Sequence, residues 1–155
     1  MKLRVGAVVC VLVAGLVGAC GTSEQGDPLL AGSLTAEYDG QPFTPTFGFA
    51  TIFEGNGLIE LGAGPIHCGS EQSSSPVVVI RVPLAVGMHG SVLVQVVQYD
   101  ANTGTYGSYG ADSGSVEITA VSPDSVAGTI AFDYTSGGGS HSAVEGSFAV
   151  VHCAP

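Results

Sequence analysis

Residues 114–134, GSVEITAVSPDSVAGTIAFDY, carry the pattern from which the fold class of this chain follows. Over Ser115–Val121, apolar residues at every second position alternate with polar ones, the pattern of a strand with one buried face. Pro123 and Asp124 form a turn signal, and the alternation resumes over Val126–Tyr134. The stretch therefore predicts two antiparallel strands joined by a short turn.

Further strands are predicted on both sides of this hairpin. Ala143–His152 alternates in the same way, so the last three strands form a meander. Signals for helices are nearly absent, and the many Val, Thr and Gly residues favour pleated structure. The remaining predicted strands are Ser33–Tyr38, Phe43–Phe53, Leu58–Leu61, Ile66–Cys68, Val77–Leu84 and Ser91–Tyr99, with a long hairpin loop over Asp100–Gly114.

Eight or nine short strands with regularly spaced turn signals predict an all-β domain. Two architectures satisfy this pattern: an antiparallel β-sandwich, or an up-and-down antiparallel sheet that closes on itself. The C-terminal strands also resemble a loose group of uncharacterised bacterial lipoproteins, whose C-terminal halves repeat "V-x-G-T-F-x-F" and "V-x-G-x-F" patterns like VAGTIAF (126–132) and VEGSFAV (144–150). That resemblance implies an all-β envelope domain and no particular activity.

The N-terminal residues predict export. Lys2 and Arg4 precede an apolar run from Val5 to Val17, which is the pattern of a signal peptide. The run is shorter than the roughly 20 apolar residues of a transmembrane helix. It ends in Leu-Val-Gly-Ala just before Cys20. The alternative to a lipidation signal is an ordinary secretory signal cleaved nearby.

This ending resembles the lipobox of bacterial lipoproteins. The resemblance implies that the Cys20 thiol receives a diacylglyceryl group and that cleavage before it makes Cys20 the mature N-terminus. We therefore expect a signal peptide over residues 1–19, a flexible tether over 20–31 and a single β-sandwich domain over 32–155. The expected location is the cell envelope. Gly21 is not the aspartate that often retains such proteins in the inner membrane, which favours the outer membrane in a two-membrane bacterium.

The charge of the chain excludes several partners. The formal net charge is −10, and removing residues 1–19 makes it −12 with Arg81 as the only basic residue. Such a chain cannot neutralise phosphates, so no nucleic-acid partner is expected. Attraction to anionic lipid is excluded as well, which leaves the acyl chains as the expected contact with the membrane.

Two cysteines remain in the predicted domain. Export places Cys68 and Cys153 in an oxidising compartment, where such a pair usually forms a disulfide. Each follows a histidine, His67 and His152, so a Cys₂His₂ metal site is an alternative, and free thiols are another. Adjacent residues of a strand point to opposite faces, which argues against placing both ligands of a pair on one metal.

Two sets of residues near the predicted loop are candidates for binding. Asp100, Asn102 and Asp112 resemble part of a calcium loop, although Thr105 stands where that pattern needs glycine. The alternative is a plain hairpin loop. The other set consists of Tyr99, Tyr106 and Tyr109, which are candidates to stack on a sugar ring or a protein partner.

Catalytic motifs are weak. His89 and His141 lie in glycine-rich and serine-rich surroundings, but neither belongs to a nucleophile elbow. No enzyme activity and no cofactor are predicted. The expected function is a lipid-anchored, non-catalytic binding or structural module with an envelope protein or glycan as partner. A calcium- or metal-dependent ligand-binding module is the alternative, and an enzyme of unknown type is the third hypothesis.

Overall fold

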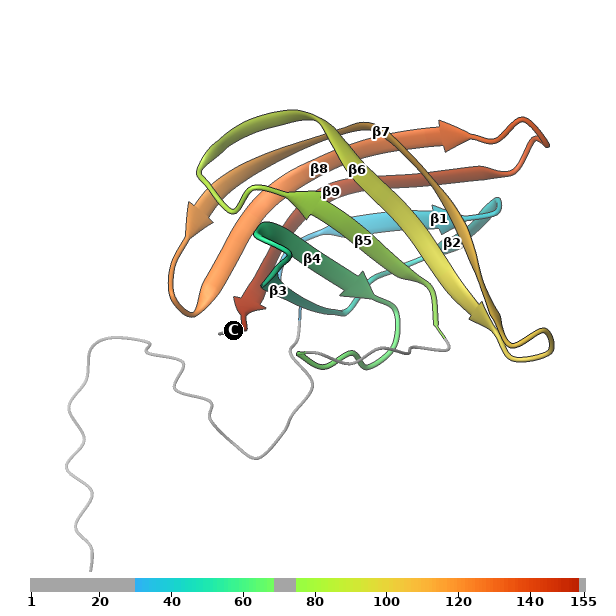
Figure 1. The fold of residues 1–155 in the computed structure, drawn as a ribbon, viewed down its shortest axis with the longest axis horizontal. Coiled ribbons are helices and arrows are strands. Elements are labelled where there is room, and N and C mark those ends of the chain that lie inside the picture. The colour runs from blue at the N-terminus through green and yellow to red at the C-terminus, as the bar shows by residue number, and fades with distance from the viewer. Residues whose placement is uncertain (1–29, 69–74, 154–155) are drawn as a thin grey trace, which may run out of the picture.

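The computed structural model describes residues 30–68 and 75–153, so Cys20, the predicted signal peptide and nearly all of the tether lie outside the described residues. None of the described residues forms a helix long and apolar enough to cross a membrane. The described chain is all-β, as predicted (Figure 1). Its strands are β1 (Leu34–Tyr38), β2 (Gln41–Phe43), β3 (Phe47–Phe53), β4 (Asn56–Gly62), β5 (Val77–Val82), β6 (Gly87–Asp100), β7 (Thr105–Val121), β8 (Ser125–Thr135) and β9 (His141–His152).

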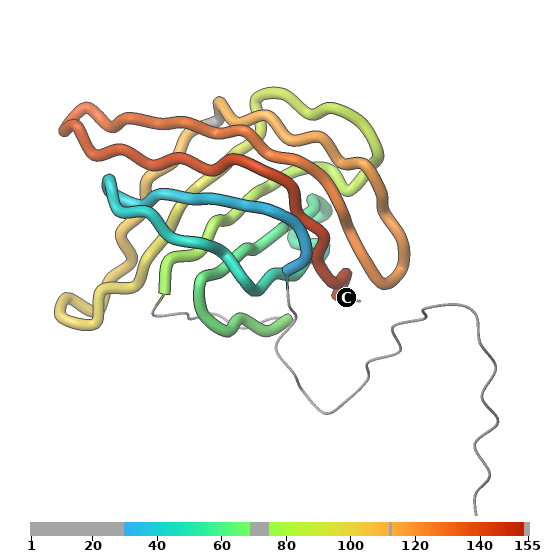
Figure 2. The backbone as a smooth tube through the Cα atoms, turned by 180° about the vertical axis from the view of Figure 1, so that it is seen from behind, coloured from blue at the N-terminus to red at the C-terminus, as the bar shows by residue number. Residues whose placement is uncertain are grey.

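The sheet is a closed barrel. Seven strands follow one another in the order β9-β3-β4-β5-β6-β7-β8, and β8 pairs again with β9. All of these pairs are antiparallel except β3 with β9, where Phe49 lies opposite Val151 in a parallel pair. On the edge of β9 that faces away from β8, the end of the strand pairs with β3 and the first half pairs with β1. β2 pairs with the other edge of β1. The β1–β2 hairpin therefore completes one end of the barrel beside β9 (Figure 2).

The predicted sandwich is wrong, and the closed sheet is the form that the chain adopts. β6 and β7 are 14 and 17 residues long. Register shifts interrupt their pairing between Gly90 and Val92 and between Val92 and Val94, and a further shift affects β7 between Ile118 and Ala120. Such bulges increase bending and twist. A single sheet of long, bent strands closes on itself.

Three other strand predictions are corrected. β7 begins at Thr105, so the predicted loop over 100–114 shrinks to the turn 101–104. Gly110 lies within β7 opposite Gln95, and glycine is required there because a Cβ would collide with the backbone oxygen of Val94. Ile66–Cys68 is part of the connection between β4 and β5, and Phe43–Phe53 divides around Pro45 into two strands.

The interior of the barrel is apolar and holds the main core. The alternation seen in the sequence is confirmed here, because β8 buries every second side chain from Val126 to Phe132. Val116 and Ile118 of β7 are fully buried, and Phe148 of β9 is 2% exposed. Burying a side chain of this size contributes about 1.5–3 kcal/mol.

A second, smaller core lies on the outside of the barrel. Phe49, Ile66 and Val77 pack there with Cys153. Glu60 stands between Phe49 and Val79 in the strand pairing, and burial raises the pKa of its carboxyl. Ile66 comes from the described start of the β4–β5 connection and packs against the outer face of the sheet.

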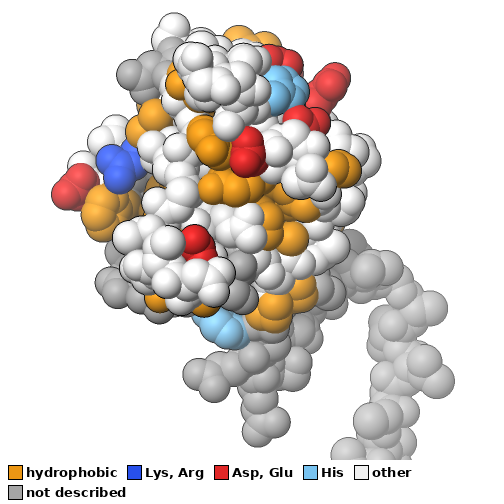
Figure 3. All heavy atoms as spheres, turned by 90° about the vertical axis from the view of Figure 1, so that its right-hand side faces the viewer, with side chains coloured by type: hydrophobic (Ala, Val, Ile, Leu, Met, Phe, Trp, Pro, Cys, Tyr) orange, Lys and Arg blue, Asp and Glu red, His pale blue; other side chains and the backbone are white. Residues whose placement is uncertain are grey.

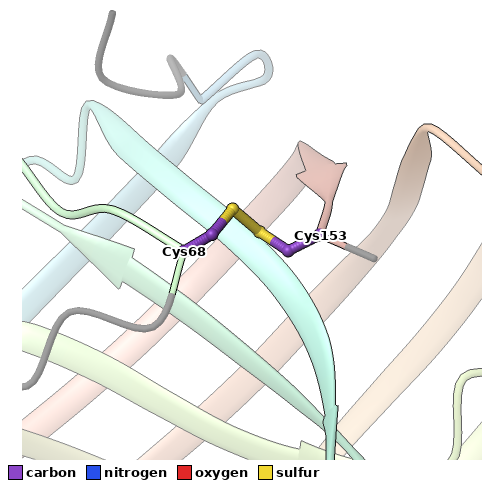
Figure 4. The surroundings of a disulfide bond; sticks show 2 residues. All are labelled: Cys68 and Cys153. Atoms are coloured by element: carbon purple, nitrogen blue, oxygen red, sulfur yellow. A yellow bond between two sulfur atoms is a disulfide. The ribbon is translucent and has the colours of Figure 1, made fainter. Parts of the chain in front are cut away.

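A disulfide between Cys68 and Cys153 ties this connection to the end of β9 (Figure 4). Their Cα atoms are 5.9 Å apart, and the two residues are separated by 85 positions in the sequence. Cys153 follows the last residue of β9 and is 8% exposed, within the outer core. The pairing agrees with the sequence prediction.

Candidate functional site

Three hairpin turns gather at one end of the barrel. These turns join β1 to β2 at Asp39 and Gly40, β6 to β7 over 101–104, and β8 to β9 over 136–140. The antiparallel pairing of β1 with β9 and of β7 with β8 places them at the same end. Figure 3 looks onto this end and shows exposed hydrophobic side chains between acidic ones.

A groove of 640 Å³ opens beside the β6–β7 turn. A second hollow of 390 Å³ shares Tyr38 and Gln98 with it and continues along the β1–β2 hairpin. We call the two together the tyrosine groove. Its aromatic walls are Tyr38, Tyr99 and Tyr106, and its polar groups come from Gln98, Asp100, Asn102 and Thr103.

Tyr99 and Tyr106 are held together by strand pairing. They lie directly opposite each other in β6 and β7, and their ring centroids are 5.2 Å apart with the planes tilted by 56°. This geometry is favourable for two aromatic rings. Tyr106 is 47% exposed, so one ring of the pair is open to a ligand.

Tyr38 comes from β1, far from the other two tyrosines in the sequence. Its ring contacts that of Tyr109, with centroids 5.3 Å apart. Tyr109 therefore supports Tyr38 from behind and is not part of the groove wall. Gly107 leaves space for the phenol, since a Cβ there would collide with the Tyr38 hydroxyl.

The Tyr38 hydroxyl keeps its proton at neutral pH. Burial raises its pKa from 10.0, and the charges of Tyr109, Asp39 and Asp100 raise it further. Tyr38 was not among the residues that the sequence pattern singled out for binding. Its place before the Asp39 turn was a signal that it ends a strand, but only barrel closure brings it to the β6–β7 turn.

Asp100 and Asn102 shape the turn instead of opening a calcium loop. The Asn102 backbone N–H donates to Asp100 Oδ1 at 2.8 Å, and the Gly104 N–H donates to the Asp100 carbonyl at 2.9 Å. The first of these bonds is the main cause that lowers the pKa of Asp100. β7 then runs on as strand, so at about 3.3 Å per residue the backbone of Asp112 lies roughly 20 Å or more from Thr105. The predicted calcium loop does not form.

The Cys₂His₂ alternative loses both of its thiols to the disulfide. His152 instead fastens the end of β9 to the β7–β8 turn: its Nδ1–H donates to the Ser122 carbonyl at 2.9 Å, and its backbone N–H donates to the Asp124 carbonyl at 3.0 Å. His67 lies exposed in the β4–β5 connection. Within residues 30–68 and 75–153, no group of three or more His, Cys, Asp or Glu side chains is placed to hold a metal ion.

The histidines considered for catalysis are engaged in other bonds. His141 Nδ1 is 2.6 Å from Glu37 Oε1, and its Nε2 is 3.2 Å from Asp133 Oδ2. These hydrogen bonds, that to Glu37 first, raise the pKa of His141. A protonated His141 therefore clamps β1, β8 and β9 together beside the groove. His89 lies in β6, and its Nε2 is 2.8 Å from the carbonyl oxygen of Ala85 in the β5–β6 connection.

Comparison of this chain with family models, curated proteins and solved structures found no match. The chemistry of the site therefore follows from its side chains. Tyrosine rings present flat apolar faces with a polar edge, and amides and hydroxyls offer directional hydrogen bonds. Asp39 and Asp100 beside the groove oppose an anionic ligand.

Proposed function

We propose that this chain is an exported, lipid-anchored protein of the bacterial cell envelope and that its barrel is a non-catalytic binding module. The tyrosine groove is the ligand site. One observation carries the proposal: tyrosines from two hairpins distant in the sequence meet at one end of the barrel around a hollow. Gly107 keeps this arrangement open by making room for Tyr38.

The ligand that fits this groove is an uncharged carbohydrate. The groove volume of 640 Å³ falls within the range of about 300–1,000 Å³ that is usual for small-ligand sites. A sugar ring has apolar faces for Tyr99 and Tyr106, and hydroxyls for Gln98 and Asn102. The acidic neighbours argue for a neutral ligand over a phosphorylated or carboxylated one.

The anchor is the N-terminal lipid. The charged start, the apolar run and the small residues before Cys20 support acylation of that cysteine. Two or more acyl chains hold a protein stably on a membrane. In a two-membrane bacterium, Gly21 favours the outer membrane. The partner is a glycan of the envelope, or an envelope protein that displays one.

The binding mode needs neither a cofactor nor a metal ion, because ring faces and neutral polar groups supply the contacts. His141, one of the two histidines considered for catalysis, has both ring nitrogens within hydrogen-bond distance of carboxylates, those of Glu37 and Asp133. We therefore expect EDTA to leave ligand binding unchanged. A module that lost its ligand on chelation would instead support the metal-dependent alternative.

The test is a titration of the full-length lipidated protein in detergent with neutral and N-acetylated oligosaccharides. The chain has no tryptophan, so its emission reports on tyrosine directly. Tyr99→Ala and Tyr106→Ala should each weaken binding by about 0.5–1.5 kcal/mol, roughly 2- to 13-fold in Kd. Met88→Ala, at the opposite end of the barrel, is the control and should bind like the wild type. Absence of any response to the sugars, or equal affinity of the tyrosine variants, would refute the ligand site.

A further inference from the structure

Most large hydrophobic side chains that the described chain exposes lie at the end of the barrel away from the tyrosine groove. Tyr106 of the groove is the exception. We call the others the apolar end; they are Ile52 (45% exposed), Phe53 (47%), Val86 (69%), Met88 (68%), Val121 (37%) and Val151 (38%).

The strand order places these residues together. β3 ends in Ile52 and Phe53, and it runs parallel to β9, which ends just after Val151. β6 begins beside Met88, and antiparallel pairing sets it against the end of β7, where Val121 is the last residue. The β5–β6, β3–β4 and β7–β8 connections therefore share one end of the barrel (Figure 1).

The chain enters the barrel beside the second half of β9, where Ala31 forms a bridge with Ala149, two residues before Val151. The backbone N–H of Leu30 donates to the carbonyl of Thr46, just before the start of β3, at 2.9 Å. Cys20 is ten residues before Leu30. Ten residues reach at most about 33–36 Å. A lipid on Cys20 thus keeps the bilayer within that distance of the second half of β9, where the chain enters.

We propose that the apolar end rests on the lipid surface to which Cys20 is attached, so that the tyrosine groove points away from the membrane. This inference depends on the lipid anchor of the proposed function. The acyl chains supply the attachment, and the exposed side chains of Val86 and Met88 enter the interface and fix the orientation. Exposed apolar patches of this kind mark interaction surfaces, and apolar contact adds to membrane affinity in proportion to the area buried.

The charges around the apolar end select the type of lipid. Arg81 lies over the Phe53 ring, 5.7 Å from its centroid, and places one positive charge there. Glu54, Asp124 and Glu117 lie in or beside the same turns and strand ends. The excess of negative charge opposes anionic headgroups. The surface is therefore suited to zwitterionic lipid, and contact should weaken as anionic lipid is added.

Tryptophan scanning tests the orientation, because the natural chain has none. Full-length lipidated Val86→Trp, Met88→Trp and Thr103→Trp are reconstituted in phosphatidylcholine vesicles with and without brominated phosphatidylcholine. Thr103, exposed in the β6–β7 turn, is the matched control at the groove end. The first two variants should emit at shorter wavelength and lose intensity with the brominated lipid, whereas Thr103→Trp should do neither.

Equal quenching of all three variants, or none at residues 86 and 88, would overturn the orientation. A blue shift at 86 and 88 without quenching would also overturn it, since that pattern indicates contact with a second copy of the chain. Flotation of the same vesicles separates this outcome from failure of the anchor. Loss of the lipid anchor leaves the protein at the bottom of the gradient, whereas a wrong orientation leaves it floating but unquenched.

Discussion

Removal of the disulfide is the perturbation with the most definite expected size. Cys68→Ala with Cys153→Ala opens a link between positions 85 apart in the sequence. On the chain-entropy model, a loop of this length contributes about 4–5 kcal/mol to the free energy of unfolding. Domains of this size are stable by only about 5–15 kcal/mol. The double variant should therefore be marginally folded, with its urea midpoint shifted strongly downward.

The assay is urea unfolding followed by far-ultraviolet circular dichroism. The denaturant slope should rise in the double variant, because the unfolded chain becomes less compact without the link. Wild-type protein in dithiothreitol is the control and should match the variant, while reductant should leave the variant itself unchanged. A loss below about 1 kcal/mol, or two titratable thiols in the native protein, would show that the disulfide does not stabilise the barrel in this way.

Three further predictions concern single positions. Gly107→Ala should displace the Tyr38 ring and weaken ligand binding without unfolding the barrel. Gly90→Ala, whose added Cβ meets no atom within 4 Å, is the control and should change neither property. Unchanged Tyr38 ring resonances in NMR spectra of Gly107→Ala would contradict this prediction. Because the pKa of His141 is raised, its hydrogen bonds stabilise the protein fully below about pH 6.5, and this stabilisation is lost as the pH rises through the raised pKa. The stability of His141→Gln should therefore fall less than that of the wild type above pH 6.5. An unaltered pH profile of stability would contradict the role of His141 as a clamp. Because burial raises the pKa of Glu60, the stability of the wild type falls as the pH rises above about 4.5. Glu60→Gln should therefore be more stable than the wild type at pH 7 and should lose that advantage in acid. A variant that is less stable at pH 7 would show that burial is not the dominant effect.

Features that depend on neighbours in the sequence could be predicted. The alternation over 114–134 gave the correct buried face of β8 and of β7 up to Ile118, whereas Ala120, beyond the register shift, is exposed. The disulfide was predicted from the expectation of export and from the two cysteines that follow Cys20 in the sequence. Tyr99 and Tyr106 lie on either side of one hairpin turn, so the pairing of β6 with β7 alone brings their rings together.

Features that depend on closure of the sheet could not be predicted. Whether strands form a sandwich or a barrel is decided by bulges such as those near Val92, which leave no clear mark in the sequence. Tyr38 joins the groove only because β1 takes the place beside β9 at that end. The glycines of β7 suggested a loop, but Gly107 and Gly110 serve close contacts between neighbouring segments. All three features depend on contacts between different segments of the chain.

The most direct test of a lipid-anchored envelope module is the intact mass of the protein purified from the membranes of its native host. We expect a chain that begins at Cys20, carries acyl groups on that residue, and lacks two hydrogens for the bond between Cys68 and Cys153. A soluble chain that begins at Met1 without lipid and with reduced cysteines would contradict it.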